Sequence, residues 1–356
     1  MADRQPTQNT CTVPHGAADV AGVTVDDYNA AVREGDGFLG DRANKRAFQA
    51  ILDKWRDSLR RLGEDPLGET PTGALNKKQI DKTLIEGDVE AAGVVHSAVE
   101  EFAQELAEVI DRFLRLETWR GTQRIALGGG LRASRVGELA IGRAAVLLKT
   151  GGQATELRPI RHHPDEAGLV GCVQLAPPRL LAGCDGMLAV DIGGTKIRAG
   201  VVELNRRKAA DFSAAHVAGL EAWRHRNDSP ERDEAVNRLL AMLEALARRA
   251  DKDGMRLAPF VGVGCPGRIR EDGSIVQGGQ NLPGGDWEDE GFNLPRRILA
   301  TLPEIDGQPT QLVMHNDAVV QGLSEASSMH DVQHWGILTI GTGLGNARFS
   351  NRRDRA

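Results

Sequence analysis

The sequence has 356 residues, of which 40% are hydrophobic and 26% charged, and its formal net charge is −6. These values predict an ordinary globular protein with about two domains, or one domain with two lobes. Acidic and basic residues are mixed along the chain, which argues against a nucleic-acid partner and a membrane-surface partner. No apolar stretch reaches the ~20 residues of a membrane helix, and the four cysteines lack a metal-binding spacing. We therefore expect a cytoplasmic protein with reduced thiols.

The amino-terminal part of the chain predicts a polar arm followed by helices. Residues 1–24 are polar and contain two prolines, so we expect a mobile arm there. Within residues 44–62, apolar side chains recur every three or four positions and predict an amphipathic helix. A longer helix with the same periodicity is expected after Gly87, with Asp88 as its N-cap.

The rest of the chain alternates strands with helices, which indicates an α/β fold. A short strand in residues 124–131 runs into three glycines, and residues 165–178 predict a short helix that a proline pair ends. A further helix is expected to begin at Ser229–Pro230. The remaining predicted strands, all after residue 186, are MLAV, IRAGVV, FVGVG, QLVM and GILTI.

The stretch MLAVDIGGTKIRAG has the pattern of a strand, a glycine turn and a second strand. Asp191 ends the first strand, where its carboxylate could hold a hydrated magnesium ion in front of the turn. Gly193 and Gly194 would let the backbone approach a phosphate, while Thr195 and Lys196 would add a hydroxyl donor and a positive charge. The same residues fit a plain hairpin with Gly-Gly in a primed turn equally well, so this motif alone leaves both interpretations open.

A second stretch, GILTIGTGLGNARF, repeats the strand–turn–strand pattern. Gly341, Gly343 and Gly345 alternate with Thr342 and Leu344, which gives GxGxG and not the GxGxxG-plus-helix pattern of dinucleotide-binding folds. One glycine hairpin is common, but two in the same chain are harder to explain as turns alone. The pair therefore indicates a nucleotide held between two related half-sheets.

Asn316 and Asp317 follow a predicted strand, at the sheet edge where α/β proteins bind their ligands. An isolated Asp at such a position is ordinarily a helix N-cap. Because it lies between a glycine turn and a nucleotide hairpin, Asp317 also suits the role of general base for a hydroxyl that attacks phosphorus.

The segment from Cys265 to Trp287 is rich in small residues, amides and carboxylates. Pro266 and Gly267 follow a predicted strand, and Asn281 lies in the glycine-rich run GGQNLPGGDW. Such a composition suits a polyhydroxylated ligand, which needs close backbone approach and many hydrogen bonds. It also fits an ordinary long loop, and composition does not separate the two.

Together these motifs resemble the ROK family of sugar kinases, within the actin-like ATPase superfamily. LAVDIGGTKIRAGVV and LTIGTGLGNA resemble the family's two phosphate motifs, HNDA its catalytic Asn-Asp pair, and GVGCPGRI with NLPGGDW its sugar-binding stretch, over residues 187–349. The resemblance implies a two-lobed actin-like ATPase (ribonuclease H-like) α/β fold with a nucleotide cleft between the lobes. It also implies ATP-dependent transfer of the γ-phosphoryl group to a hydroxyl of a hexose or amino sugar.

The order of the motifs implies a circular permutation of that fold. The segment GDVEAAGVVHSAVEEFAQELAEVIDRFLRL and the later RIALGGGL resemble the family's long helix and adenosine-side glycines, yet they precede the first phosphate motif. We therefore expect one lobe from residues 25–163 plus 317–350 and the other from residues 164–316, after the arm of residues 1–24. The alternative is a fusion or fragment whose halves complement each other between chains in a swapped dimer.

The resemblance also assigns roles to individual residues. Asp317 would be the general base and a sugar-binding residue, and Asp191 would hold Mg²⁺ through water. The other expected contacts to the sugar are Asn281, Asn316, Pro266 and Gly267, and those to ATP are Gly193, Gly194, Thr195, Lys196, Thr342, Gly343, Gly345, Gly129 and Gly130. No zinc is expected, because the family's Cys/His zinc motif and its Glu-x-Gly-His segment are both missing.

The expected partner is a small-molecule sugar, with neither nucleic acid nor membrane, and a homodimer stays open. DNA binding is not expected, since the polar amino-terminal arm does not resemble a helix-turn-helix. The alternative to a working kinase is a sugar- or nucleotide-binding regulator, or a pseudokinase, on the same fold, because part of the usual sugar-recognition set is missing.

Overall fold

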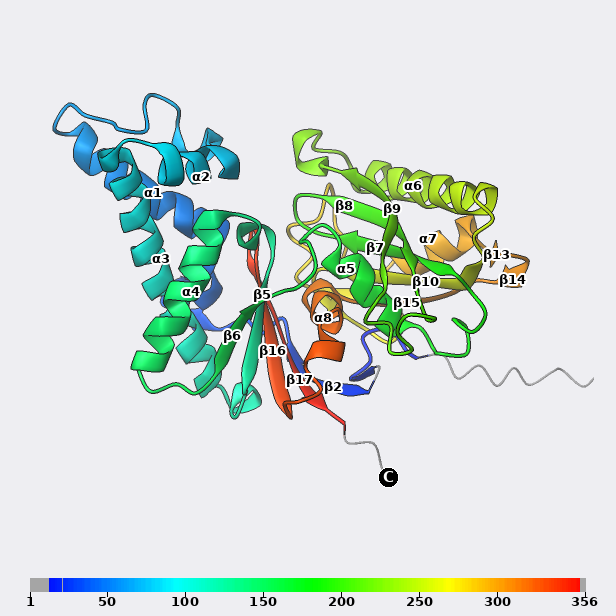
Figure 1. Cartoon of the computed structure of the whole chain (residues 1–356). Coiled ribbons are helices and arrows are strands. Elements are labelled where there is room, and N and C mark those ends of the chain that lie inside the picture. The colour runs from blue at the N-terminus through cyan, green and yellow to red at the C-terminus, as the bar shows by residue number, and fades with distance from the viewer. Residues whose placement is uncertain (1–12, 21, 353–356) are drawn as a thin grey trace, which may run out of the picture.

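The computed structural model describes residues 13–20 and 22–352. Figure 1 shows two lobes, each built on a β-sheet with helices on its outer face, and two short helices between the sheets. Within the described residues, no helix is both long and apolar enough to span a membrane.

The sheet of the second lobe has the strand order β15-β10-β7-β8-β9. Its strands are β7 (Gly186–Ile192), β8 (Ile197–Glu203), β9 (His216–Trp223), β10 (Leu257–Cys265) and β15 (Gln311–Asn316). β7, β8 and β9 form an antiparallel meander, while β10 runs parallel to β7 and β15 parallel to β10. In chain order this is the 3-2-1-4-5 arrangement of a ribonuclease H-like sheet.

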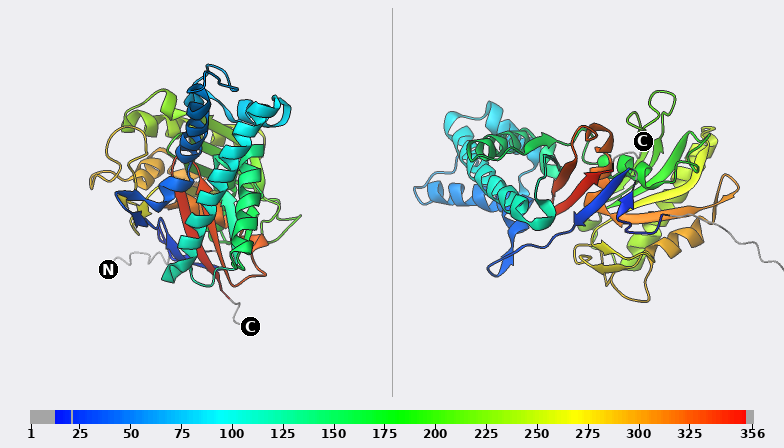
Figure 2. Two further views of the ribbon diagram at one scale, coloured as in Figure 1. Left: turned by 90° about the vertical axis from the view of Figure 1, so that its left-hand side faces the viewer. Right: turned by 90° about the horizontal axis from the view of Figure 1, so that it is seen from below.

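The sheet of the first lobe has the same arrangement, but its strands come from both ends of the chain. In order across the sheet they are β1 (Asp19–Val20), β2 (Val23–Tyr28), β17 (Leu344–Asn351), β16 (His334–Ile340), β5 (Arg124–Gly128) and β6 (Glu156–Pro159). β16, β17 and β2 form the meander, β5 runs parallel to β16, and β6 runs parallel to β5. The blue and red strands in Figure 2 therefore lie side by side although they are far apart in sequence. Two such sheets give the actin-like ATPase fold that the sequence predicts.

Helices cover the outer face of each sheet and fill the space between the sheets. In the first lobe, α3 (Val89–Arg115) and α4 (Arg135–Thr150) lie on the sheet, with α1 (Lys45–Arg60) and α2 (Lys77–Glu86) packed against them. In the second lobe, α6 (Arg232–Lys252) and α7 (Leu294–Thr301) share one core with the sheet. The central helices α5 (Ala167–Gly171) and α8 (Asp317–Leu323) pack against each other, in a core that includes strands of both sheets.

The alternation of side chains along β7 explains why this strand carries a buried carboxylate between the lobes. Leu188 and Val190 point into the core beneath α6 and α7, whereas Met187 and Ala189 point into the core around α5 and α8. Asp191 shares the parity of the second pair and therefore faces the central helices. Asp191 is only 2% exposed.

The element boundaries agree with the sequence in some places and differ in others. Asp88 is the N-cap of α3, as predicted. The helix predicted from Ser229–Pro230 begins later, because Glu231 is its N-cap and forms a capping box with Glu234. The short hairpins are β3 (Arg33–Glu34) with β4 (Gly37–Phe38), β11 (Arg268–Ile269) with β12 (Ile275–Gln277), and β13 (Glu304–Ile305) with β14 (Gln308–Pro309).

The segment expected as a mobile arm is in part a strand and an edge cover. Residues 1–12 of the predicted arm lie outside the described residues. The Met314 N–H donates to His15 Nδ1 (2.9 Å), and the Gly16 N–H donates to the Met314 carbonyl (3.0 Å). Since β15 is an edge strand, its free backbone groups find partners in this segment. The arm as predicted therefore extended too far along the chain.

Candidate nucleotide and sugar site

Strands of the second lobe end side by side and carry the predicted polar residues. Asp191 of β7 lies opposite Gly264 of β10, and Cys265 of β10 lies opposite Asn316 of β15. Asp317 follows as the first residue of α8. This is the carboxyl edge of the sheet, where α/β proteins bind their ligands.

Asn316 holds the start of α8 in place. Its side-chain Oδ1 accepts hydrogen bonds from the N–H groups of Ala318 (2.9 Å) and Val319 (3.3 Å), and its Nδ2 donates to the Gly267 carbonyl (3.0 Å). Asn316 is therefore the N-cap, and the alternative that Asp317 is the cap is wrong. The Asn316 amide, expected to contact sugar, uses its oxygen and one of its two N–H groups to position α8 and the loop at Gly267.

Asp317 has the electrostatic surroundings of a base that works near neutral pH. Its pKa is raised to about 7, first because burial disfavours the charged carboxylate and second because Asp191 is negatively charged nearby. Backbone N–H groups at the start of α8 act in the opposite direction. A carboxyl with such a pKa is divided between its ionised and protonated forms at pH 7.

The two glycine hairpins meet between the lobes. The Thr195 hydroxyl of the first hairpin lies 3.0 Å from the Thr342 hydroxyl of the second. The first hairpin closes at Ile192 and Ile197 and so leaves a four-residue loop, in which neither glycine has a positive φ. The alternative of a two-residue primed Gly-Gly turn is therefore wrong.

Gly345 at the start of β17 brings the second hairpin against α8. A Cβ at Gly345 would lie 2.4 Å from the Thr339 Oγ1 and 3.2 Å from the Ala318 Cβ, so a larger residue would push this strand away. Gly343, at the tip of the same loop, has no such neighbour and is exposed. The hairpin therefore rests on the helix that carries Asp317, with its tip accessible.

The predicted adenosine-side glycines follow β5, beside a lysine that the sequence motifs do not point to. Gly129 has a φ of +84°, and a Cβ there would lie 2.5 Å from backbone atoms of β16. The Gly130 carbonyl accepts a hydrogen bond from Lys77 of α2. The pKa of Lys77 is lowered, mainly by burial and then by the charges of Lys196 and Lys45. Cationic side chains from both lobes therefore converge here.

A cavity of about 390 Å³ opens where the lobes meet at Gly194 and Thr342. Asn281 is exposed in its wall, and a Cβ on Gly194 would lie 3.0 Å from the Asn281 Cβ, so glycine permits this close approach. The rest of the wall is polar and contains cations from both lobes. Its residues are Arg46, His225, Arg226, Ser229, Pro230, Glu231, Gln280, Pro283, Gly284 and Gly285.

The predicted residues thus fall into two neighbouring groups. Gly194, Asn281 and Thr342 line the cavity, whereas Pro266, Gly267, Asn316 and Asp317 do not. The hairpin that carries Thr342 approaches the start of α8 at Gly345, where a Cβ would lie 3.2 Å from the Ala318 Cβ.

A network of ion pairs that the sequence motifs do not indicate lies at the first hairpin. Lys196 Nζ contacts both oxygens of Asp165 at 2.9 and 3.0 Å, and Arg198 donates to Asp165 Oδ1 through Nε (2.9 Å) and Nη2 (2.7 Å). Arg198 also donates to Asp191 Oδ2 (3.0 Å). Burial alone would raise the pKa of Asp165, but Lys196 and Arg198 outweigh it and lower the pKa to about 2. The hairpin register, which pairs Asp191 with Arg198, could have revealed the second contact from sequence.

The donor set at this edge fits a magnesium ion bound mainly through water. Asp191 and Asp317 are oxygen donors. The charge of Asp191 raises the pKa of Asp317, while burial raises the pKa of Asp191 itself and its ion pair with Arg198 acts in the opposite direction. Mg²⁺ typically uses one or two carboxylates together with waters and substrate phosphates. Among residues 13–20 and 22–352, no group of three or more His, Cys, Asp or Glu side chains could hold a metal by itself.

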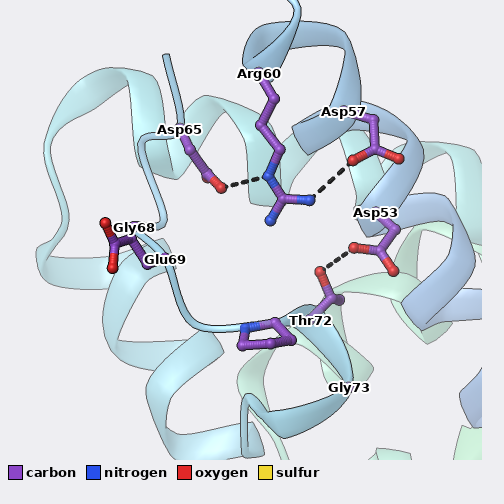
Figure 3. Close-up of a pocket in the computed structure, with 9 residues that line it drawn as sticks. Asp53, Asp57, Arg60, Asp65, Gly68, Glu69, Thr72 and Gly73 are labelled. Carbon is purple, nitrogen blue, oxygen red and sulfur yellow. Dashed lines mark hydrogen bonds and ion pairs between the residues drawn. The ribbon is translucent and has the colours of Figure 1, made fainter. Parts of the chain in front are cut away.

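A larger hollow, of about 760 Å³, lies away from these residues on α1 and the loop that follows it (Figure 3). Four of its charged side chains and its threonine are already paired, since Arg60 bridges Asp57 and Asp65, and Thr72 donates to Asp53. The region between the lobes, and not this hollow, is therefore the candidate site.

No protein-family profile matches the sequence, and no curated protein matches it. Among solved structures, the chain is similar to a ROK family glucokinase from Streptomyces griseus in complex with glucose and AMPPNP, at 21% identity and a TM-score of 0.33 over 47% of this chain and 45% of that chain. It is also similar to a ROK hexokinase from Thermus thermophilus, at 23% identity and a TM-score of 0.31 over 47% of this chain and 48% of that chain. The matched part spans about half the length of each of these structures.

Proposed function

We propose that the protein is an ATP-dependent sugar kinase that transfers the γ-phosphoryl group to a hydroxyl of a hexose or amino sugar. The observation that supports this most is the 3.0 Å contact between the hydroxyls of Thr195 and Thr342, which brings both glycine hairpins to one point. Such hairpins bind phosphates through backbone N–H groups and small side chains. The start of α8, with Asp317, lies beside the second of them.

Asp317 would act as the general base. Its carboxylate would accept the proton of the sugar hydroxyl while the hydroxyl oxygen attacks the γ-phosphorus, and the bond from that phosphorus to the bridging oxygen of ADP would break. A pKa of about 7 keeps the carboxylate basic and still leaves much of it ionised at neutral pH.

The other residues would position and stabilise the reactants. Thr195, Thr342 and Lys196 would contact the donor's phosphates, and Asn281 would contact the sugar. Asn316 would act through α8, since its amide fixes the helix that carries Asp317. Magnesium at Asp191, when bound, would neutralise phosphate charge. Positioning and electrostatics supply most of the catalysis in phosphoryl transfer.

We propose further that the chain is a circular permutation of the usual fold. β17 and β2 pair as neighbours in an antiparallel meander, and the Arg352 N–H donates to the Gly22 carbonyl at 2.9 Å. In a meander, a short turn normally joins two neighbouring strands such as β17 and β2. Here these two strands are not consecutive in the chain, and residues 179–185 connect the two halves instead. We prefer an intrachain permutation over a swapped dimer, because the short connection of residues 179–185 is long enough to join the two halves within one chain.

A binding-only regulator or a pseudokinase is the second candidate, and one observation favours it. The charged residues of the first hairpin are already ion-paired, Lys196 with Asp165 and Asp191 with Arg198. A site that keeps these pairs would bind nucleotide weakly or without turnover.

Sugar-dependent release of ADP separates the two candidates. Purified protein with ATP and Mg²⁺ is assayed against a panel of hexoses and amino sugars, and nucleotide binding is measured in parallel. A kinase gives turnover with at least one sugar, whereas a regulator or pseudokinase binds nucleotide or sugar and releases no ADP.

A further inference from the structure

Asp165 lies in the segment that crosses from the first lobe to the second, between β6 and α5. It is the common acceptor for two cations of the first phosphate hairpin, Lys196 and Arg198. The side chains of Asp165 and Lys196 are 27% and 25% exposed, so the pair is accessible to a ligand and yet screened less than a surface pair.

The Lys196 ammonium has two possible partners, Asp165 and a phosphate of the donor. Its contacts of 2.9 and 3.0 Å direct it to both oxygens of Asp165. Its neighbour Thr195 forms the contact with the second hairpin, where the donor's phosphates are proposed to bind. An ammonium group has three N–H donors but a single positive charge. A phosphate therefore gains the full electrostatic attraction of Lys196 only if Asp165 loses part of its own contact with that ammonium.

We propose that Asp165 competes with the donor's phosphates for Lys196, and so sets the affinity and the placement of the donor. This inference rests on the proposed function, in that the donor binds between the two hairpins. Arg198 makes the exchange feasible, because its contacts of 2.9 and 2.7 Å keep the Asp165 carboxylate paired after Lys196 has moved. Asp165 is then a positioning residue, which acts on the donor through Lys196.

The sign of the effect distinguishes competition from a purely structural role. If Asp165 only supports the hairpin, its loss loosens the phosphate loop and weakens nucleotide binding. If Asp165 competes, Asp165→Asn removes a negative charge beside an anion site and frees Lys196, so that anions bind more tightly.

The test measures binding, by calorimetry, of ATP without Mg²⁺ and of inorganic tripolyphosphate to the full-length protein. Asp165→Asn should bind both anions at least about fivefold more tightly than wild type. A change of this size lies within the usual range for coupling between two interactions in one protein. Asp165→Glu keeps the charge and should stay closer to wild type. Asp251→Asn removes the same charge from an exposed position on α6 and should leave the affinity unchanged.

Lys196→Gln provides the second arm. In this background Asp165→Asn should give a clearly smaller gain, since no ammonium remains to be released. Equal or weaker binding by folded Asp165→Asn, or an undiminished gain in the Lys196→Gln background, would overturn the competition while leaving the kinase proposal intact. Absence of ATP binding to both wild type and Asp165→Asn, with and without Mg²⁺, would overturn the two together.

Discussion

At the scale of single residues, Asp317 sets the expected dependence of the reaction on pH. Its native pKa is about 7, and the base must be deprotonated to accept a proton. We expect kcat/KM to rise with pH through about 7 and to level off above it. A profile of sugar-dependent ADP release between pH 5 and pH 9 checks this. A flat profile across that range would contradict the assignment of Asp317 as base.

The same carboxyl should lower the stability of the protein as the pH rises. Because the pKa of Asp317 is higher in the native state than its ordinary 3.8, the native state binds more protons than the unfolded state between about pH 4 and pH 7. The free energy of unfolding therefore falls as pH rises through this window. We expect Asp317→Asn to raise the Tm relative to wild type at pH 8 more than at pH 5.

Asp331→Asn is the control of opposite sign for that measurement. The hydrogen bond from Arg124 lowers the pKa of Asp331 to about 2, so its charged form belongs to the folded state. Its removal should not raise the Tm at neutral pH. If both variants shift the Tm in the same direction at every pH, the account of Asp317 is wrong.

Some site residues could be found from sequence and others could not. Thr195, Lys196 and Asp317 belong to local motifs, and the strand ends bring them to the same region. Asp165 could not be found, because its partner Lys196 is 31 positions away and the contact depends on how the lobe-crossing segment folds back. Arg198 was within reach, since the register of a hairpin follows from its loop length.

At the scale of elements, the packing of α5 against the carboxyl end of β7 depends on a glycine. A Cβ on Gly168 would lie 2.5 Å from the Asp191 Cγ, whereas a Cβ on Gly142 of α4 would meet nothing within 4 Å. We expect Gly168→Ala to lower the free energy of unfolding by about 1–3 kcal/mol, as overpacking does, and to reduce turnover by displacing Asp191.

Gly142→Ala is the matched control, because alanine favours a helix over glycine by about 0.5–1 kcal/mol. It should raise stability slightly and leave turnover unchanged. Denaturant unfolding and ADP-release assays on both variants check the pair. Wild-type stability and turnover in Gly168→Ala would contradict the proposed fit of Asp191 against α5.

The strands β2 and β9, which the sequence did not predict, share a physical cause. β9 is an edge strand whose residues alternate between exposed and half-buried, so it shows no hydrophobic run. β2 lies at the end of a polar segment and is a strand because it pairs with β17. Strands of this kind depend on distant partners more than on their own composition. The buried strands β7, β10 and β16, by contrast, are visible as apolar runs.

At the scale of the whole molecule, the order of the motifs predicted both related sheets, while the way the lobes pack did not follow from sequence. The proposed permutation can be reversed by design. A chain opened at the exposed Gly183, with Ala356 joined directly to Met1, should fold as a monomer with wild-type turnover, since the entropic cost of closing a loop grows only slowly with its length. Sedimentation and thermal unfolding check this.

A matched chain with the same junction, but opened within the buried strand β7, should fail to fold. If the chain opened at Gly183 is active only as a dimer, the swapped arrangement replaces the intrachain permutation.

The most direct test of the account compares wild type with Asp317→Asn in the sugar-panel assay of ADP release, with the affinity for ATP measured on both proteins. We expect at least one sugar to support turnover by wild type. In the variant, kcat should fall by roughly 10²–10⁴-fold, as expected for loss of a general base, while ATP binding is retained. Equal sugar-dependent turnover in the two proteins would contradict the role of Asp317. Absence of sugar-dependent turnover in wild type, with ATP bound, would contradict the kinase itself.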